Sequence, residues 1–310
     1  MGICFYQVFT VSVLCFITGC GNVSPESGIR LALSADIRGF DPAQAVDIRA
    51  GKILSLVYDN LIHFGDSTDL VPGIASQWNV SDSGKEYRFT LRKNALFHDG
   101  NSVTAKDVVR SFERILNPET LSPQGWIFTR IEGSVAFVRG VSPFVSGLIA
   151  ENDSSLIIRL KNPFSPFIQY LAMPSSAIIN YRDVDSIKEI PAGSGPWKLA
   201  KWERDGKIQL IRNDNYWGEK PKEPGLSFRI LSEAMTRSAE FEAGNLDFLT
   251  IPSTEIQRWV ANPKFRNNVV HVDELNVWYV GLNCSRPPFN DVRVRQAMVL
   301  SLDRKKHLEL

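Results

Sequence analysis

Residues 86–109 read Glu-Tyr-Arg-Phe-Thr-Leu-Arg-Lys-Asn-Ala-Leu-Phe-His-Asp-Gly-Asn-Ser-Val-Thr-Ala-Lys-Asp-Val-Val. In the first eight positions apolar side chains alternate with polar ones, which is typical of a half-buried strand. A polar loop follows at 94–100. The run Thr104-Ala105-Lys106-Asp107 then resembles a capping box with aspartate in place of glutamate, and it begins a helix that Asn117-Pro118 ends. The segment therefore predicts a strand, a loop and a helix in succession.

Strand and helix patterns intermingle along the rest of the chain. Alternation or short apolar runs predict strands at 29–33, 155–161, 207–213, 226–231 and 277–282. Apolar residues at helical spacing predict helices at 50–64, 236–243 and 292–302. Gly244 suits the end of the second of these helices, and Asp291 is the expected N-cap of the third. The mixture favours an α/β or α+β architecture over a bundle or a barrel.

Composition and motifs exclude several function classes. The chain has 310 residues, enough for about two domains, and its 44% hydrophobic content can supply a core. A net charge of +1 gives no electrostatic reason to expect a nucleic-acid partner. There is no CxxC, HExxH, GxSxG or SxxK motif, and the turn at Gly193-Ser194-Gly195-Pro196 is not a phosphate loop. We therefore expect no enzyme, no metal site and no cofactor.

The N-terminus points to export. Residues 3–18 are almost wholly apolar, a run suited to a signal peptide, although residues 1–7 lack the usual Lys or Arg. The run ends Ile17-Thr18-Gly19-Cys20, which resembles the lipobox of bacterial lipoproteins and implies cleavage before Cys20 and lipidation of its sulfur. Such anchoring predicts a location in the cell envelope, in the periplasm or on the outer face of the cytoplasmic membrane. Cys284 would then be the one remaining thiol.

Four sequence blocks carry a family resemblance. They are 70–78 with 82–108, 193–199 with 212–217, 241–248, and 281–283 with 287–297. In this order they resemble the family 5 extracellular solute-binding proteins, which bind oligopeptides and dipeptides for ABC importers. The resemblance covers nearly all of residues 29–305. We interpret most residues of these blocks as marks of the fold rather than as ligand contacts.

The resemblance implies a periplasmic-binding-protein-like, mixed α/β fold of two lobes, with an extra subdomain in the first lobe. It divides the chain into a signal peptide (1–19), a tether and start of lobe I (20–45), lobe I with the extra subdomain (46–189), lobe I continued (190–270), and a crossing strand with the start of lobe II (271–310). Family members continue for about 200 further residues, so we expect lobe II to be incomplete and tight peptide capture by cleft closure to be lost.

The resemblance also implies ligand-binding positions. Phe40-Asp41-Pro42 matches the family's Leu-Asp-Pro, and the following segment places backbone contacts to a peptide at Val46, Asp47 and Ile48. The segment before the second crossing strand corresponds to Phe248, Leu249 and Thr250, and Trp278 falls where aromatic side chains line the pocket. The expected partners are a peptide ligand, an ABC permease and the membrane that holds the lipid. We expect a monomer.

Other functions remain open at this point. Within the same family the ligand could be a nickel chelate, heme or an oligosaccharide, and the sequence does not discriminate among them. A peptide-sensing surface receptor would have the same sequence features. A secreted hydrolase is a further alternative, although none of its usual motifs is present.

Overall fold

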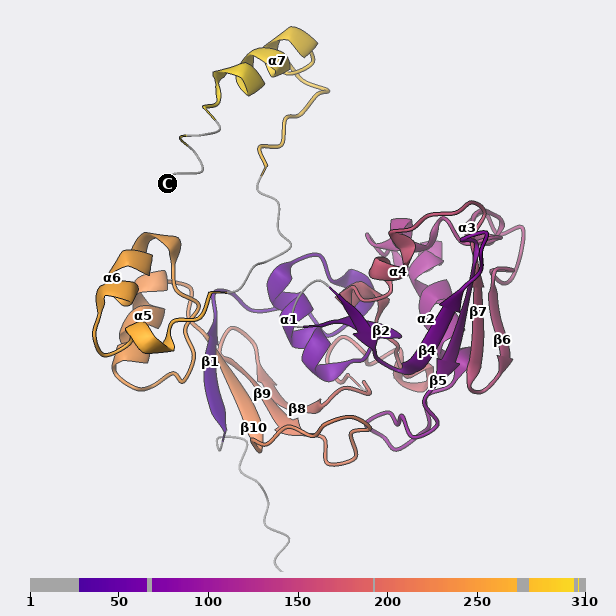
Figure 1. Cartoon of the computed structure of the whole chain (residues 1–310), viewed down its shortest axis with the longest axis horizontal. Coiled ribbons are helices and arrows are strands. Elements are labelled where there is room, and N and C mark those ends of the chain that lie inside the picture. Colours follow the sequence, from indigo (N-terminus) through magenta and orange to yellow (C-terminus); the bar gives the residue numbers. More distant parts are fainter. Residues whose placement is uncertain (1–27, 66–68, 192, 272–278, 304–305, 307–310) are drawn as a thin grey trace, which may run out of the picture. The chain divides into compact units, whose positions relative to one another are not determined.

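The computed structural model describes residues 28–65, 69–191, 193–271, 279–303 and 306 (Figure 1). The chain divides into two compact units, and the boundary between them in the sequence falls between Val269 and Val270. The predicted lipobox with Cys20, and Trp278, lie outside the described residues. Within the described ranges, no helix is both long and apolar enough to cross a membrane.

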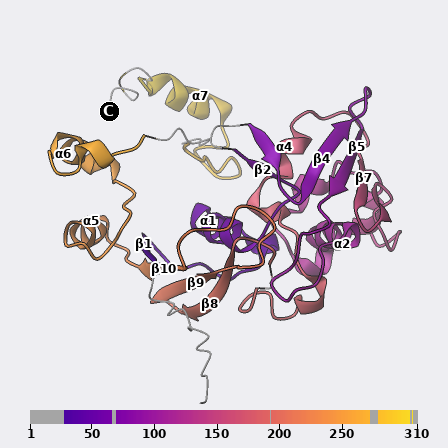
Figure 2. The ribbon, with the colours of Figure 1, turned by 60° about the horizontal axis from the view of Figure 1, so that its bottom comes forward.

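The first unit contains a four-stranded mixed sheet in the order β1-β10-β9-β8. Its strands are β1 (Ile29–Leu33), β8 (Trp197–Glu203), β9 (Lys207–Arg212) and β10 (Gly225–Ile230). β1 runs parallel to β10, and the other neighbours are antiparallel hairpin partners. Helix α1 (Ile48–Val57) lies against one face of this sheet and buries its apolar stripe there (Figure 2). The strands predicted near 29, 207 and 226 are thus confirmed.

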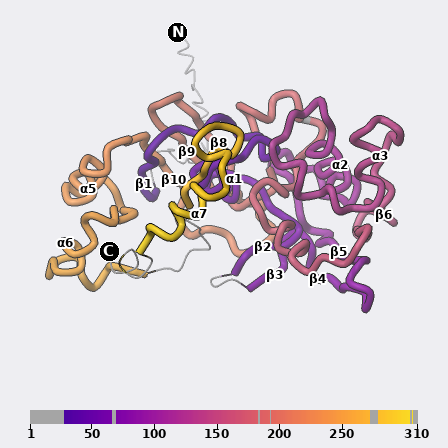
Figure 3. Tube along the Cα trace, turned by 90° about the horizontal axis from the view of Figure 1, so that it is seen from above, coloured from indigo at the N-terminus to yellow at the C-terminus, as the bar shows by residue number. Residues whose placement is uncertain are grey.

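A second sheet of the same unit is wholly antiparallel, in the order β4-β5-β7-β6. Its strands are β4 (Ala75–Val80), β5 (Glu86–Leu91), β6 (Leu148–Asn152) and β7 (Ser155–Arg159). Helices α2 (Ala105–Leu116), α3 (Ser134–Val138) and α4 (Phe167–Tyr170) accompany it, and the two sheets have separate hydrophobic cores. Viewed from above, α2, α3 and β6 lie away from β1, β8 and β10 within this unit (Figure 3).

Helix α2 forms as the sequence pattern predicts. The hydroxyl of Thr104 accepts a hydrogen bond from the N–H of Asp107, and the Asp107 carboxylate accepts one from the N–H of Thr104 at 2.9 Å. These reciprocal bonds satisfy N–H groups that a helix start leaves free. The apolar stripe of α2, with Phe112 and Ile115 buried, then packs into the hydrophobic core of the antiparallel sheet β4-β5-β7-β6.

The helix predicted at 50–64 is wrong at both ends. α1 begins at Ile48, where Asp47 is the N-cap and accepts the N–H of Ala50 at 3.0 Å. It ends at Val57, and residues 62–64 form the short strand β2 (Ile62–Phe64), paired with β3 (Leu70–Pro72). Tertiary contacts override the helical pattern here. Pairing with β3 satisfies the backbone hydrogen bonds of residues 62–64, so this segment forms a hairpin strand although its apolar residues have helical spacing.

Glycines allow the turn at 193–196 to lie directly against the end of α1. A Cβ at Gly193 would lie 2.0 Å from the carbonyl oxygen of Val57, and one at Gly195 would lie 2.7 Å from that of Leu56. The N–H of Gly195 donates to the Val57 carbonyl at 2.9 Å. These glycines are therefore needed for close backbone approach.

The remaining helices of the first unit are α5 (Ala234–Glu242) and α6 (Ile256–Ala261). Gly244 follows α5 with φ +76°, as expected for a helix end. Phe241, Trp259 and Phe265 pack together with ring centroids 5.1 to 5.6 Å apart. This aromatic cluster fixes the two helices to each other.

The second unit contains helix α7 (Val292–Ser301), which begins at the predicted N-cap Asp291. Its side chain accepts the N–H of Arg293 at 2.8 Å. The strand predicted at 277–282 is wrong in its described part, because residues 279–282 have no strand partner there and Tyr279 is largely exposed.

Candidate functional site

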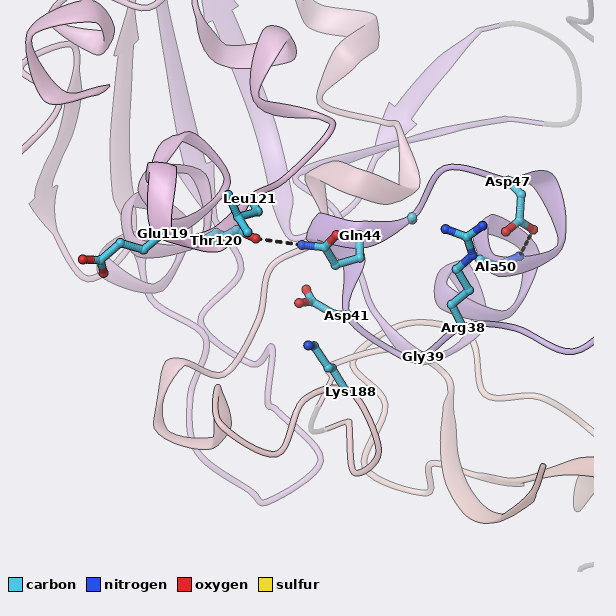
Figure 4. A pocket seen from close by; sticks show the side chains of 11 residues that line it. Arg38, Gly39, Asp41, Gln44, Asp47, Ala50, Glu119, Thr120, Leu121 and Lys188 are labelled. Atoms are coloured by element: carbon cyan, nitrogen blue, oxygen red, sulfur yellow. Dashed lines mark hydrogen bonds between the residues drawn. The ribbon is translucent and has the colours of Figure 1, made fainter. Parts of the chain in front are cut away.

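A pocket of about 430 Å³ opens beside the start of α1 in the first unit (Figure 4). It is formed by three segments far apart in the sequence. The lining residues are Arg38, Gly39, Asp41, Gln44, Ala45, Asp47, Ala50, Glu119, Thr120, Leu121 and Lys188. No group of three or more metal-ligating His, Cys, Asp or Glu side chains occurs among the described residues. Seven of these eleven residues are polar or charged.

Asp41 holds the floor of the pocket in place. Its buried carboxylate accepts two hydrogen bonds from Arg114 of α2, at 2.8 and 2.7 Å, and also caps the short 3-10 helix Pro42–Gln44 through the N–H of Ala43. Phe40 before it belongs to one core and Ala43 after it to the other. The ion pair therefore joins the two halves of the first unit at the pocket.

A second wall is fixed by side chains that bond backbone carbonyls. Gln44 donates to the carbonyl of Thr120 at 2.8 Å, Ser122 donates to that of Ala43 at 2.6 Å, and Gln124 donates to that of Ala45 at 2.7 Å. Between them Leu121 adopts φ 49° and ψ 37°, the left-handed region that residues with a Cβ rarely occupy. The loop is thus held rigidly against the 42–45 segment.

The third wall comes from the segment before β8. The N–H of Phe40 donates to the carbonyl of Lys188 at 2.9 Å, and a Cβ at Gly39 would lie 3.2 Å from the same oxygen. This close approach brings Lys188 to the same pocket as Arg38, although the two residues are far apart in the sequence. Two cationic side chains therefore line the pocket.

The first predicted ligand segment lies at the pocket. Asp47 lines it, with an extended backbone at φ −125° and ψ 156°, whereas the side chains of Val46 and Ile48 are exposed. Extended backbone, as the family resemblance implies, thus continues to Asp47, and Ile48 is the first helical residue. Its use by a ligand stays a prediction.

The second predicted segment follows α5. Asp247 ties it to β1, because its N–H donates to the Arg30 carbonyl at 2.8 Å and its carboxylate accepts Arg30 Nε at 3.0 Å. The next residue, Phe248, is 60% exposed, so plain core packing does not explain it; Leu249 is half-buried and Thr250 exposed. In the part of the chain that the structure describes, no hydrogen bond joins this segment to residues 46–48.

The family-like sequence blocks mostly hold the fold together. His98 Nε2 lies 3.0 Å from the carbonyl oxygen of Gly195, which also accepts a hydrogen bond from Asn213 at 3.0 Å. Trp217 donates its indole N–H to the buried carboxylate of Asp59 at 2.7 Å. Burial lowers the pKa of His98 to about 4, so its ring is neutral at pH 7.

Several pocket residues were absent from the sequence prediction. Arg38 and Gln44 stand in the predicted lobe I segment, and their proximity to Asp41-Pro42 is the one available signal. Lys188 and Leu121 come from distant loops with no motif around them. Only the tertiary contacts bring these side chains to one cavity.

The chain is similar to two curated solute-binding proteins of Escherichia coli K12. It is 29% identical over 267 residues to the dipeptide-binding protein, covering 80% of this chain and 49% of that protein. It is 27% identical over 267 residues to the nickel-binding periplasmic protein, covering 82% and 48%. The chain therefore spans about half the length of the curated relatives it matches.

A solved structure is similar to this chain in fold. The Escherichia coli murein tripeptide binding protein MppA superposes with a TM-score of 0.71 at 25% identity, covering 77% of this chain and 49% of that one. The expected mixed α/β, periplasmic-binding-protein-like fold is thereby confirmed.

The family model for the middle part of the bacterial extracellular solute-binding proteins, family 5, matches residues 69–310. That range includes all four blocks from which the resemblance was drawn. The family consists of extracytoplasmic solute-binding proteins rather than enzymes. The chain belongs to family 5 of the bacterial extracellular solute-binding proteins.

Proposed function

We propose that the protein binds short peptides outside the cytoplasm and delivers them to an ABC importer. One observation carries the choice of a peptide. In the described part of the chain, no hydrogen bond engages the backbone N–H of Val46, Asp47 or Ile48, or the carbonyl of Val46. The backbone of residues 248–250 is likewise unpaired there. Two exposed segments thus offer backbone donors and acceptors.

Such groups suit a ligand that itself carries alternating N–H and C=O groups. An extended peptide can pair with them as an added strand, whatever its side chains are. Each bond contributes about 0.5–1.5 kcal/mol net, so several are needed to offset the ordering of a flexible ligand. A nickel ion forms no bonds to backbone N–H groups, and heme can accept them only at its two propionates. Donors and acceptors along both segments therefore favour a peptide over those ligands of the same family.

Ile48→Pro tests this pairing. Proline is well tolerated at the first position of a helix, and the extended Asp47 before it is compatible with proline, so α1 should keep its stability. The substitution removes one unpaired N–H. We expect peptide affinity, measured by calorimetric titration with a tripeptide mixture, to fall roughly two- to tenfold, the equivalent of about 0.5–1.5 kcal/mol.

Ile48→Ala is the matched control, because it removes the same side chain and keeps the N–H. If the backbone N–H of residue 48 binds the peptide, Ile48→Ala should bind peptide as tightly as the unmodified protein does. Equal losses in both variants would show that the side chain, not the N–H, is used. Titrations of the unmodified chain with nickel chloride and heme test the other ligands directly, and tight binding of either without binding of peptide would overturn the proposal.

We also propose that a lipid on Cys20 anchors the protein. The apolar run before it and the small residues Thr18 and Gly19 support this. Cys20→Ala removes the sulfur that receives the lipid, so the protein should move from the membrane fraction to the soluble fraction of a cell lysate. Metabolic labelling with a radioactive fatty acid provides the second readout, and equal labelling of both forms would contradict the anchor.

A further inference from the structure

Leu121 lies at the pocket rim, and both its backbone conformation and the exposure of its apolar side chain are energetically unfavourable. Its backbone lies in the left-handed region, which a glycine adopts without steric cost, and its side chain is 82% exposed. The hydrogen bonds from Gln44 to Thr120 and from Ser122 to Ala43 hold the loop in this shape. Neither packing nor backbone preference explains a leucine here. Residues held in this way against their preference cluster at ligand sites.

Arg38 and Lys188 bring positive charge to the pocket. Two of its three acidic side chains are engaged, since both Asp41 oxygens bond Arg114 and Asp47 caps α1. The third, Glu119, extends away from Arg38 and Lys188 (Figure 4). Among the ion pairs found in the described residues, none includes Arg38 or Lys188. In the close view, Lys188 extends on the Asp41 side of the pocket and Arg38 extends on the Asp47 side (Figure 4). Two cations without an ion-pair partner therefore border a cavity large enough for a small ligand.

We propose that this pocket is a subsite for the carboxyl end of a peptide with an apolar last residue. Arg38 and Lys188 bind the carboxylate, and Leu121 contacts the apolar side chain. The inference rests on the proposed peptide-binding function and adds to it a preference among peptides. A carboxylate fits the two cations, and an apolar group fits the one exposed apolar side chain among the pocket's lining residues.

The methyl groups of Leu121 provide a direct reporter. In a protein carrying ¹³C-methyl leucine, valine and isoleucine, the Leu121 resonances are assigned by their loss in Leu121→Gly. We expect them to shift on titration with Ala-Ala-Leu, and the C-terminal amide of that peptide to bind roughly fivefold more weakly. Arg38→Gln and Lys188→Gln should each reduce this difference. Arg139→Gln, at an exposed arginine outside the pocket, should leave it unchanged.

Leu121→Gly separates a ligand contact from a structural role. Because the side chain is exposed and the backbone left-handed, the melting temperature should stay the same or rise by up to about 2–4 °C. The affinity for Ala-Ala-Leu should nevertheless fall severalfold. A structural residue would give the opposite result, a lower melting temperature with unchanged affinity, and that outcome would overturn the assignment of Leu121.

The same spectra distinguish the two levels of the proposal. If the methyls of Val46 and Ile48 shift with peptide but those of Leu121 do not, peptide binding stands and the subsite is wrong. The subsite is also wrong if the amide binds as well as the free acid, or if acetate alone shifts Leu121 to the same extent. If no methyl group shifts with any peptide, the proposed function and the subsite fail together.

Discussion

Arg114→Met is expected to destabilise the protein by about 3–5 kcal/mol, because it leaves the carboxylate of Asp41 buried without its counter-charge. Asp41 is 3% exposed, and its second oxygen has no bonding partner other than Arg114 among the described residues. Tyr58 nearby stays a neutral phenol, because burial, and then the Asp41 charge, raise the pKa of its hydroxyl, and a neutral group does not replace the lost positive charge. Urea unfolding of the two proteins measures the difference.

Arg30→Met is the matched control for this prediction. Arg30 binds Asp247 through two nitrogen atoms, as Arg114 binds Asp41, but both partners are about 40% exposed. Solvent screens exposed ion pairs, which contribute little to stability, so this variant should lose little. Equal losses in the two variants would show that burial of the Asp41 pair does not decide its contribution. Loss of folding in Arg114→Met alone would place its effect above the predicted range.

The ion pair between Asp41 and Arg114 also explains the structural role of the Phe40-Asp41-Pro42 motif. In Phe40-Asp41-Pro42, the aromatic residue enters one core, the carboxylate binds Arg114 of α2, and the proline begins the 3-10 helix. The motif precedes the predicted ligand segment at residues 46–48. Its own residues position that segment, because they connect the two cores on either side of the pocket.

Local signals in the sequence predicted local structure well. The capping box at Thr104 and the N-cap at Asp291 depend on residues within one helical turn, and both are present. The end of α1 depends instead on the pairing of 62–64 with 70–72, which no pattern within the helix reveals. Periodicity therefore found the helix and misplaced its boundaries.

The candidate site was predictable to a smaller extent. The family resemblance indicated residues 46–48, and Asp47 does line the pocket. Lys188 reaches it through a backbone contact with Phe40, and Leu121 through a loop held by Gln44. Neither the contact nor the left-handed backbone leaves a signal in a single sequence. The charges and the strain that suggest a ligand therefore become visible only in the folded chain.

His98 should make stability fall as the pH is lowered from about 6.5 to 4. Its Nε2 donates to the Gly195 carbonyl when the ring is neutral, and its buried Nδ1 has no partner among the described residues. A proton on Nδ1 would therefore be buried without an acceptor, and burial lowers the pKa of His98 from 6.5 to about 4. The unfolded chain binds this proton between those pH values and the folded chain does not, so acidification favours unfolding.

The size of this effect follows from the same two pKa values. The fall of the pKa from 6.5 to about 4 corresponds to a loss of about 3 kcal/mol of stability on acidification. None of this stability is lost above pH 7, and the loss is complete near pH 4. His98→Gln keeps an N–H for Gly195 and cannot titrate, so its stability should change less between pH 7 and 4. Other groups titrate in both proteins, and the difference between the two urea-unfolding curves therefore isolates His98. Parallel losses of stability would mean that His98 is protonated equally in the folded and unfolded chains, and the contact between the 94–100 loop and the 193–196 turn would then be insensitive to pH.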